Sequence, residues 1–581
     1  MRNPIPLHLL CFRCLLLTSA IAGSPVRGED GDPDPAFGDG GRAVHAWPAG
    51  ETLQAETTAG ATAPDGSVIA GGWISHSAGQ QHYAVTLLRW RADGTPDPGF
   101  GDDGVARIDL DPTAHIRETL VAVVPQPGGK LLAVAGIQLP DQMAYRPVLL
   151  SMRADGTPDE AFGPGGMRPI DTAPWDALGD VQIRATAAQP DGKIVLAGIL
   201  VTGDGYHVLV GRVLPDASPD AGFGFQGYRT VSFDLVDAGY DSLMGIFPLA
   251  DGKLMLLGRA EIADEITAAA PPAMVRLTAA GNVDTAFAAN GRRVFATSPW
   301  PAARFYYRGV ARQPDGKFLF GGYCLNCSGT YSAVVLRADA SGEPDASFGT
   351  AGWSLVPAPT NPALASLHVD ARGRIVLAGS TVGGGERQVL VARLTADGQA
   401  DTSFGADGNG ASVLALPDHT AAEWNVTSVA SERDGSLYLG VSNYVPIDGG
   451  SRGGVARLHA DGSLDTAYGT GGLRELTREQ GSRIEAIARR SDGRLVAAGS
   501  IDHTGGSRDF YVARLLPDGT LDHDFDGNGI ARYEISPQQD DGLALALSAG
   551  MPVIAGHTYA PDATAAVLRL ESDLLFADGL D

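Results

Sequence analysis

Cysteine and basic residues are both scarce in this sequence. The chain has four Cys among 581 residues, and 43 Lys and Arg against 68 Asp and Glu, for a formal net charge of −25. So acidic a chain lacks the cations that replace counterions on nucleic acid or that attract an anionic membrane surface. Both kinds of partner are therefore disfavoured, and we interpret the acidity as solubility in a secreted, monomeric protein.

A long apolar run occurs only at the N-terminus. Residues 7–22 are mostly apolar, follow Arg2 and end in Ala20-Ile21-Ala22, although Arg13 interrupts them. A positive start, an apolar stretch and a small-residue site are typical of a signal peptide. No later stretch has the ~18–20 apolar residues of a membrane helix. The sequence predicts a signal peptide at 1–22 and an exported protein without membrane insertion, located outside the cell, on its surface or in the periplasm.

The known catalytic motifs are missing as well. We find no G-x-S-x-G, no H-E-x-x-H and no glycine-rich phosphate or dinucleotide fingerprint. Of twelve His, only His76 and His82 share a loop, and their i, i+6 spacing is weak for a metal. A glycosidase pair of carboxylates cannot be chosen among so many acids. No catalytic residue is predicted.

The cysteines form two close pairs. Cys11 and Cys14 fall in the leader, and Cys324 and Cys327 enclose Leu-Asn. In an exported chain the second pair predicts a local disulfide. A redox centre is the alternative, but no helical pattern begins there to lower a thiol pKa. Zinc would need two further ligands, which no nearby cluster offers.

A repeat dominates the rest of the sequence. The aromatic residue of a D-x-x-F-G pattern recurs nine times over 488 residues, an average interval of 61. An Asp precedes it by three residues and a Gly follows by four. The nine aromatic positions are Phe37, Phe100, Phe162, Phe223, Phe287, Phe348, Phe404, Tyr468 and Phe525.

A second signature, such as QPDGKIVLAG at 189–198, lies between these copies. In that repeat, VQIRATAAQ, KIVLAG, YHVLVGRVL and YRTVSFDL predict four short strands, A to D, with Gly198 ending strand B. Pro-Asp-Gly provides the A–B turn. Four antiparallel strands per repeat indicate an all-β protein, a β-propeller whose blades must stack to bury both faces.

The two ends of the chain complement each other. The repeats begin with a D strand, GRAVHAW at 41–47, and end with a C strand, AAVLRLES at 565–572. The first could complete the last blade and so remove two exposed edges. This predicts one closed ring of nine blades over residues 30–575, followed by a short tail at 576–581. An open or split assembly is the alternative.

These paired motifs resemble the delta-60 repeat, a bacterial propeller-type repeat. The match, xxPDGKIxxxG followed by VxRLxxDGxxDxxFGxxG, covers residues 30 to 575. The resemblance implies a β-propeller that is secreted or surface-exposed, and it implies no known activity or catalytic residue. Ala288 and Asp526 stand where Gly is usual, and the ninth copy of the second signature is degenerate.

Strand C carries an Arg in every unit but the second, where Ser151 stands, and in the seven such units that a D-x-x-F copy follows, this Arg precedes its Asp by eight residues. Because Arg can grip a carboxylate with two parallel hydrogen bonds, we predict one structural ion pair per repeat. Ligand binding at each blade is the alternative. Clear examples are Arg393 with Asp401, Arg457 with Asp465, and Arg514 with Asp522. The repeat Phe is predicted to fill the seam between blades.

The loops suggest where recognition occurs. In a four-strand meander the A–B and C–D connections share one end, here the turn face, and the B–C and D–A connections share the other, here the loop face. The loop-face segments differ in every repeat, as binding loops on a fixed frame do, although drift alone would also make them differ. Some D–A loops combine aromatic and acidic residues that suit carbohydrate or peptide contact, or simple loop packing: Trp175, Asp176, Asp180, Trp300, Phe305, Tyr306, Tyr307, Asp418, His419, Glu423 and Trp424.

Two classes of function remain. One is a secreted, non-catalytic scaffold or binding propeller whose partner is an extracellular protein or carbohydrate. The other is an extracellular propeller enzyme, a hydrolase or lyase acting on glycans or another polymer.

One loop resembles a calcium site when it is taken alone. Asp522, Asp524, Asp526 and Asn528 follow the D-x-D-x-D-G-N spacing of such loops. Position twelve, which should be acidic, is Tyr533. In the repeat alignment Asp522 is the repeat Asp, so the loop is first a blade connection. Calcium is the only cofactor that the sequence suggests.

Overall fold

The computed structural model describes residues 42–569, apart from a set of short segments. The predicted signal peptide, the first D-x-x-F copy and the C-terminal tail lie outside the described residues. The segments left out between the two limits are 46–51, 64, 66, 78–80, 92–94, 111–117, 139–144, 170–178, 190, 203–204, 215–217, 234–240, 261–270, 296–297, 301–303, 328–330, 359–361, 384–385, 418–422, 446–449, 477–480, 491, 503–507, 526–527, 534–539, 549–550 and 559–564.

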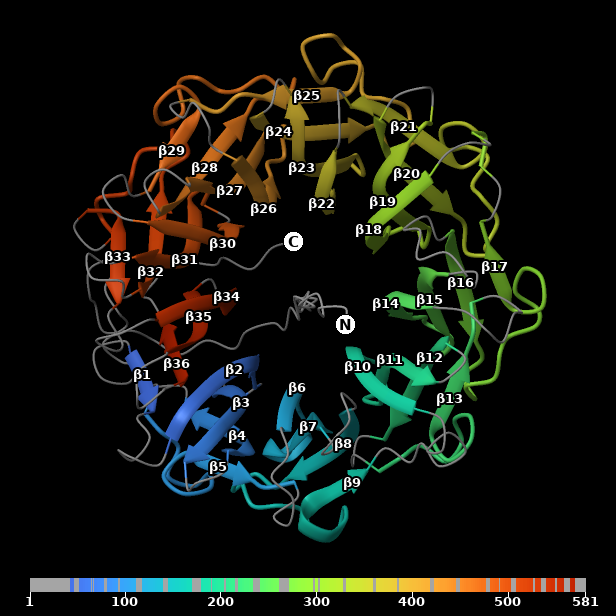
Figure 1. Cartoon of the computed structure of the whole chain (residues 1–581), viewed down its shortest axis with the longest axis vertical. Helices are drawn as coiled ribbons and strands as arrows, with labels where there is room; N and C mark the ends of the chain where they lie inside the picture. The colour runs from blue at the N-terminus through green and yellow to red at the C-terminus, as the bar shows by residue number, and fades with distance from the viewer. Residues whose placement is uncertain are drawn as a thin grey trace, which may run out of the picture.

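The described residues form an all-β structure with two short 3-10 turns, η1 (Pro127–Gly129) and η2 (Pro164–Gly166). This confirms the all-β prediction. In the described part of the chain, thirty-six strands make nine antiparallel sheets of four strands each. Figure 1 shows these sheets side by side around a common centre, the arrangement of a β-propeller. Each sheet is open, and its A strand lies innermost, which in the last sheet is β34 while β1 lies outermost (Figure 1).

The strand bounds follow the repeat. Sheets one to three comprise β2 (Thr52–Thr62), β3 (Val68–Ser77), β4 (Gln81–Trp90), β5 (Val105–Ile108); β6 (Glu118–Pro125), β7 (Leu131–Gln138), β8 (Tyr145–Met152), β9 (Met167–Pro169); and β10 (Gly179–Ala188), β11 (Ile194–Thr202), β12 (Gly205–Val213), β13 (Tyr228–Val231). Sheets four to six comprise β14 (Ser242–Pro248), β15 (Leu254–Arg259), β16 (Pro272–Leu277), β17 (Arg292–Val294); β18 (Arg304–Arg312), β19 (Phe318–Leu325), β20 (Tyr331–Ala338), β21 (Trp353–Ala358); and β22 (Ala363–Val369), β23 (Ile375–Gly383), β24 (Glu386–Leu394), β25 (Ala411–Leu414). Sheets seven to nine comprise β26 (Glu423–Ser431), β27 (Leu437–Val445), β28 (Gly450–Leu458), β29 (Leu473–Glu475); β30 (Ser482–Arg489), β31 (Leu495–Asp502), β32 (Arg508–Leu515), β33 (Ile530–Tyr533); and β34 (Asp540–Ser548), β35 (Met551–Thr558), β36 (Ala565–Arg569), β1 (Arg42–His45).

The last sheet contains both ends of the described chain. Strand β1 pairs antiparallel with β36, with Arg42 opposite Leu568 and His45 opposite Ala565. The first strand of the repeat region therefore occupies the D position of the last sheet, as the sequence predicts. The described parts of the two predicted strands are Arg42–His45 and Ala565–Arg569, and the remaining residues of the predicted ranges lie outside the described residues.

Gly198 does not end strand B, contrary to the prediction. β11 continues to Thr202, and Gly198 pairs with both Ile183 and Leu209. The equivalent Gly322 shows the physical reason, because a Cβ there would collide with the carbonyl of Tyr306 on the neighbouring inner strand. Glycine at this position allows a close approach of two backbones.

The cores lie between sheets, because each sheet is apolar on both faces. One cluster joins Val376 and Val391 of sheet β22–β25 to Leu439 and Val441 of sheet β26–β29. Burying such side chains provides about 1.5–3 kcal/mol each. Among the described residues, no helix is both long and apolar enough to cross a membrane.

Candidate functional site

The Asp-rich loop after β32, residues 522–528, is held mainly by the protein's own groups. Asp522 is buried, and its Oδ2 lies 2.7 Å from Arg514 Nε and 3.1 Å from Arg494 Nε. The Asn528 Oδ1 accepts a hydrogen bond from the Ile530 amide at 2.7 Å. Asp524 is exposed, and Asp526 lies outside the described residues.

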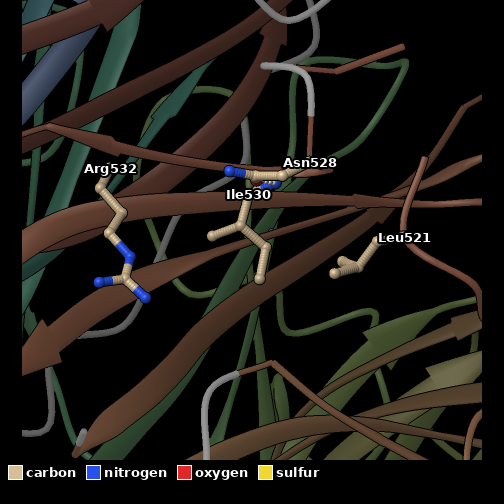
Figure 2. Close-up of a pocket in the computed structure, with 4 residues that line it drawn as sticks. All are labelled: Leu521, Asn528, Ile530 and Arg532. Atoms are coloured by element: carbon tan, nitrogen blue, oxygen red, sulfur yellow. Dashed lines mark hydrogen bonds between the residues drawn. The ribbon is translucent and has the colours of Figure 1, made fainter. Parts of the chain in front are cut away.

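These contacts fit a blade connection better than a metal site, because two cations already balance the Asp522 carboxylate. Among the described residues, no group of three or more His, Cys, Asp or Glu side chains is arranged to hold a metal. A shallow, open hollow of about 400 Å³ adjoins the loop and is lined by Leu521, Asn528, Ile530 and Arg532 (Figure 2). None of these four residues is a carboxylate. Calcium at this loop stays a prediction.

The pairing at Asp522 recurs around the molecule, at the turn face. Asp oxygens lie 2.7–2.8 Å from the repeat Arg in six sheets and 3.4 Å away in the first: Arg89–Asp97, Arg212–Asp220, Arg276–Asp284, Arg337–Asp345, Arg393–Asp401, Arg457–Asp465 and Arg514–Asp522. The structure thus brings together each of these predicted partners. In the second repeat, which lacks this Arg, Lys130 lies 2.9 Å from Asp159.

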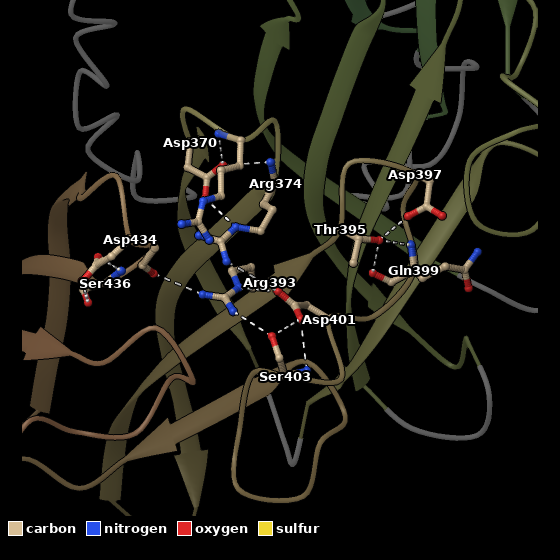
Figure 3. A network of polar contacts seen from close by, with 12 residues as sticks. Asp370, Arg374, Arg393, Thr395, Asp397, Gln399, Asp401, Ser403, Asp434 and Ser436 are labelled. Atoms are coloured by element: carbon tan, nitrogen blue, oxygen red, sulfur yellow. Dashed lines mark hydrogen bonds and ion pairs between the residues drawn. The ribbon is translucent and has the colours of Figure 1, made fainter.

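Arg393 shows what each pair does (Figure 3). Its side chain is fully buried, and its Nε donates to Asp401 Oδ2 at 2.7 Å. Its Nη1 donates to the carbonyl of Gly435 in the next sheet at 3.2 Å, and its guanidinium lies 4.2 Å from the centre of the Phe404 ring. The Arg therefore joins its own D-x-x-F connection to the neighbouring sheet.

The repeat aromatic seals the same seam. Phe404 is fully buried, and a Cβ on Gly462 of the next repeat would lie 2.8 Å from its ring. The adjacent Gly405 amide donates to the carbonyl of Asp461 in that repeat at 2.7 Å. Gly in the Asp-Gly turn is thus required by the ring beneath it, as well as by its positive φ.

The carboxylates at this face are held in their charged form. Burial alone would raise the pKa of Asp401, but hydrogen bonds from Ser403 and the charge of Arg393 outweigh it and hold that pKa below its ordinary value. The same balance, with Ser347, Lys317 and Arg337 as partners, lowers the pKa of Asp345 strongly. These are the signs of structural ion pairs, since a charge partner favours the ionised carboxylate.

The loop face of sheet β18–β21 differs from this pattern. Tyr306 lies directly opposite Tyr323 across β18 and β19. Their rings stack with centroids 4.7 Å apart and planes 8° from parallel, and both side chains remain partly exposed. Immediately beyond Tyr323, a disulfide joins Cys324 and Cys327, whose Cα atoms are 5.9 Å apart. This pair of tyrosines is the candidate site.

The other aromatic residues of the D–A loops have packing roles wherever they are described. Tyr307 and Trp424 are buried in seams between sheets. Phe305 packs against the Trp353 ring at 4.9 Å, and Trp300 lies against the same cluster. The remaining members of the predicted loop set lie outside the described residues or have undescribed side chains: Trp175, Asp176, Asp180, Asp418, His419 and Glu423.

Two pairings near the loop face could not be predicted from the sequence, one in sheet β18–β21 and one in sheet β2–β5. Tyr323 directly precedes the Cys pair, which was the available signal that it belongs to a fixed loop. His76 and His82, considered only as i and i+6, are direct cross-strand partners in the β3–β4 register. Their side chains lie outside the described part of the structure.

Fold and repeat together define the protein as a β-propeller built from repeats. Six segments match the family model described as a domain of unknown function (DUF5122) beta-propeller. They are 63–100, 189–223, 313–348, 373–404, 432–468 and 490–525. Each match ends at the repeat aromatic that fills the seam. The model thus supports a β-propeller repeat family, without distinguishing the delta-60 repeat.

No curated protein matches the chain. Among solved structures, Sqt1 from Chaetomium thermophilum is 11% identical, with 90% of this chain and 100% of that chain covered and a TM-score of 0.34. A protein of unknown function from Dyadobacter fermentans is 13% identical, with 59% and 98% covered and a TM-score of 0.28. The β-propeller domain of the Trilobed protease from Pyrococcus furiosus is 10% identical, with 70% and 96% covered and a TM-score of 0.30. At these scores the similarities support no functional conclusion.

Proposed function

We propose that this protein is an exported, non-catalytic β-propeller that binds a carbohydrate on its loop face, at sheet β18–β21. The observation that carries the proposal is the Tyr306–Tyr323 stack, partly exposed beside a disulfide-held loop. Tyrosine offers a flat apolar face and a polar hydroxyl at low cost in side-chain entropy. A pyranose ring presents the matching combination of C–H faces and hydroxyl edges.

The contrast between the two faces supports this location. At the turn face, the repeat Asp and Arg groups are engaged with one another and with neighbouring sheets, as Arg393 shows. Because these side chains are already bound to one another, they stabilise the fold and are poorly placed to bind a ligand. At the loop face, segments of different sequence meet the inner strands, and a binding site on such a face can be specific to one blade.

The proposal includes the architecture: the nine sheets are the blades of a single closed ring, and the repeats are of the delta-60 kind. Pairing of β1 with β36 and the contact of β2 with β35 support closure between the two ends of the chain. Deleting residues up to His45 would uncover the outer edge of β36, which is aggregation-prone. We expect a lower melting temperature and concentration-dependent aggregation on size-exclusion chromatography. A deletion variant that stays monomeric with unchanged melting would refute closure.

A glycan array tests the binding proposal. We expect the mature protein to bind a defined set of saccharides, and Tyr306→Ala and Tyr323→Ala to lose most of that binding while keeping the wild-type melting temperature. Phe225→Ala is the matched control, because Phe225 is an aromatic at the turn face with 58% of its surface exposed. Equal loss in the control, or binding unaffected by both tyrosine changes, would contradict the site.

The same experiment separates binding from catalysis. Bound saccharides are incubated with the protein and examined by mass spectrometry for shortened or unsaturated products. We expect no turnover, and products from a bound polymer would replace the binding proposal by a glycan hydrolase or lyase. Binding of peptides but not of sugars would instead point to a protein partner.

A further inference from the structure

Every inner strand carries a β-bulge at the same position. In all nine sheets the register between strands A and B shifts by one residue at this position, which adds one residue to the inner strand; β2 has a second shift nearer its start. The nine extra residues are Thr58, Val121, Arg184, Met244, Arg308, Ala365, Thr427, Glu485 and Leu543. A bulge bends its strand and re-aims a side chain. The repeat thus provides one re-aimed position per sheet on the strand nearest the centre, and seven different residue types occupy the nine positions.

Arg308 belongs to neither of the seams beside its strand. Tyr307 packs into the cluster shared with sheet β14–β17, and Gly309 faces the opposite seam, where a Cβ would lie 3.0 Å from the Leu367 side chain. Arg308 is the extra residue between them, and its side chain is exposed. Among the described strands none pairs with β18 on its inner side, so Arg308 belongs to an edge strand, and Figure 1 shows that β18 borders the centre around which the sheets are arranged.

The charge of Arg308 is not balanced by its described surroundings. Within the described residues its side chain makes no ion pair or hydrogen bond, in contrast to the repeat arginines of the turn face such as Arg393. The equivalent bulge positions in the two neighbouring sheets are Met244 and Ala365, which carry no charge. An exposed, unpaired cation next to the centre is notable in a chain with a net charge of −25.

Arg308 also lies close to the tyrosine pair. It follows Tyr306 by two residues on β18, so about 7 Å of strand separates their Cα atoms. We propose that the saccharide bound at Tyr306 and Tyr323 is anionic, and that Arg308 binds its carboxylate or sulfate group. A guanidinium matches such oxyanions with two parallel hydrogen bonds. This inference rests on the carbohydrate-binding function proposed above and specifies its ligand class.

The test compares wild-type protein with Arg308→Gln on one panel of neutral, uronate-bearing and sulfated oligosaccharides, with affinities measured by calorimetry. Arg433→Gln is the control, because Arg433 is an exposed arginine in the turn between β26 and β27, at the turn face. We expect acidic oligosaccharides to bind best. Arg308→Gln is expected to weaken them by about 10- to 100-fold, as for the loss of a charge-assisted hydrogen bond, and to leave neutral sugars within about twofold.

A methyl-esterified uronate oligosaccharide, which keeps the sugar but loses the charge, should bind both proteins equally weakly. The uronate and sulfate arms identify which oxyanion is preferred. Neutral sugars binding as well as acidic ones, or acidic sugars binding Arg308→Gln as tightly as wild type, would overturn the inference while the carbohydrate site stands. If no oligosaccharide binds, the proposed function and this inference both fail.

Discussion

Replacing Arg393 with Met tests whether the repeat ion pair is structural. The change keeps an unbranched apolar stem but removes the guanidinium, which is fully buried. Three hydrogen bonds are lost, to Asp401, to the Gly435 carbonyl and to Ser403, together with the contact to the Phe404 ring. All of these bonds lie at one seam, so the cost is concentrated there.

The size of the effect follows from what is left behind. Removing one partner of a buried pair costs about 3–5 kcal/mol, because the other charge stays buried. Asp401 keeps hydrogen bonds from Ser403 and a contact with Arg374 Nη1 at 4.0 Å. We therefore expect the lower end, a loss of about 3 kcal/mol in the free energy of unfolding.

A double-mutant cycle separates the pair from general disruption. Urea unfolding followed by tryptophan fluorescence is measured for Arg393→Met, Asp401→Asn and the double variant. If the two side chains stabilise each other, the double variant should lose about 2 kcal/mol less than the sum of the single losses. Additive losses within about 0.5 kcal/mol, or an unchanged Arg393→Met, would refute the reasoning. Arg433→Met, which removes an exposed arginine near the same seam, should be close to neutral.

Three further predictions concern the same frame. Gly398→Ala should lower the free energy of unfolding in urea by about 1–3 kcal/mol more than Gly316→Ala. Both glycines have positive φ, but only at Gly398 would a Cβ overlap the Phe348 ring. Equal losses would contradict the packing of the repeat Phe against this turn. Because the pKa of Asp345 is lowered on folding, its contribution is present above its ordinary value near 4 and is lost as the pH falls further. Asp345→Asn should therefore destabilise at pH 7 and approach wild-type stability in acid titrations below that value, whereas a difference independent of pH would be inconsistent with the ion pair. A chelator should leave the melting temperature unchanged, since two arginines already balance Asp522; a lower melting temperature would establish a calcium site.

Much of the fold could be predicted because the repeat combines two strong local signals. Pro-Asp-Gly predicts a turn and short apolar runs predict strands, and the four-stranded antiparallel unit that they indicate is confirmed. The role of Gly198 was misassigned because its cause is a backbone approach from the inner strand, which has no signature in its own segment. The number of blades and the closed ring stay predictions that the β1–β36 pairing supports.

The candidate site was only partly predictable. Tyr306 belongs to the predicted set of loop aromatics, but the sequence could not separate it from Phe305 and Tyr307, because which strand residues face a seam depends on where the strand lies. Arg308 was missed because a bulge is set by pairing with another strand. It can be found afterwards, because it precedes Lys317 of the Pro-Asp-Gly-Lys signature by nine residues, and the bulge residue has the same offset in the first eight repeats, before the degenerate ninth.

The most direct test of the division between a stabilising turn face and a recognising loop face is saccharide binding by two variants, measured at a temperature where both are folded. We predict that Tyr306→Ala loses binding at wild-type stability, while Arg393→Met keeps binding at reduced stability. Binding lost in Arg393→Met and kept in Tyr306→Ala would contradict the account.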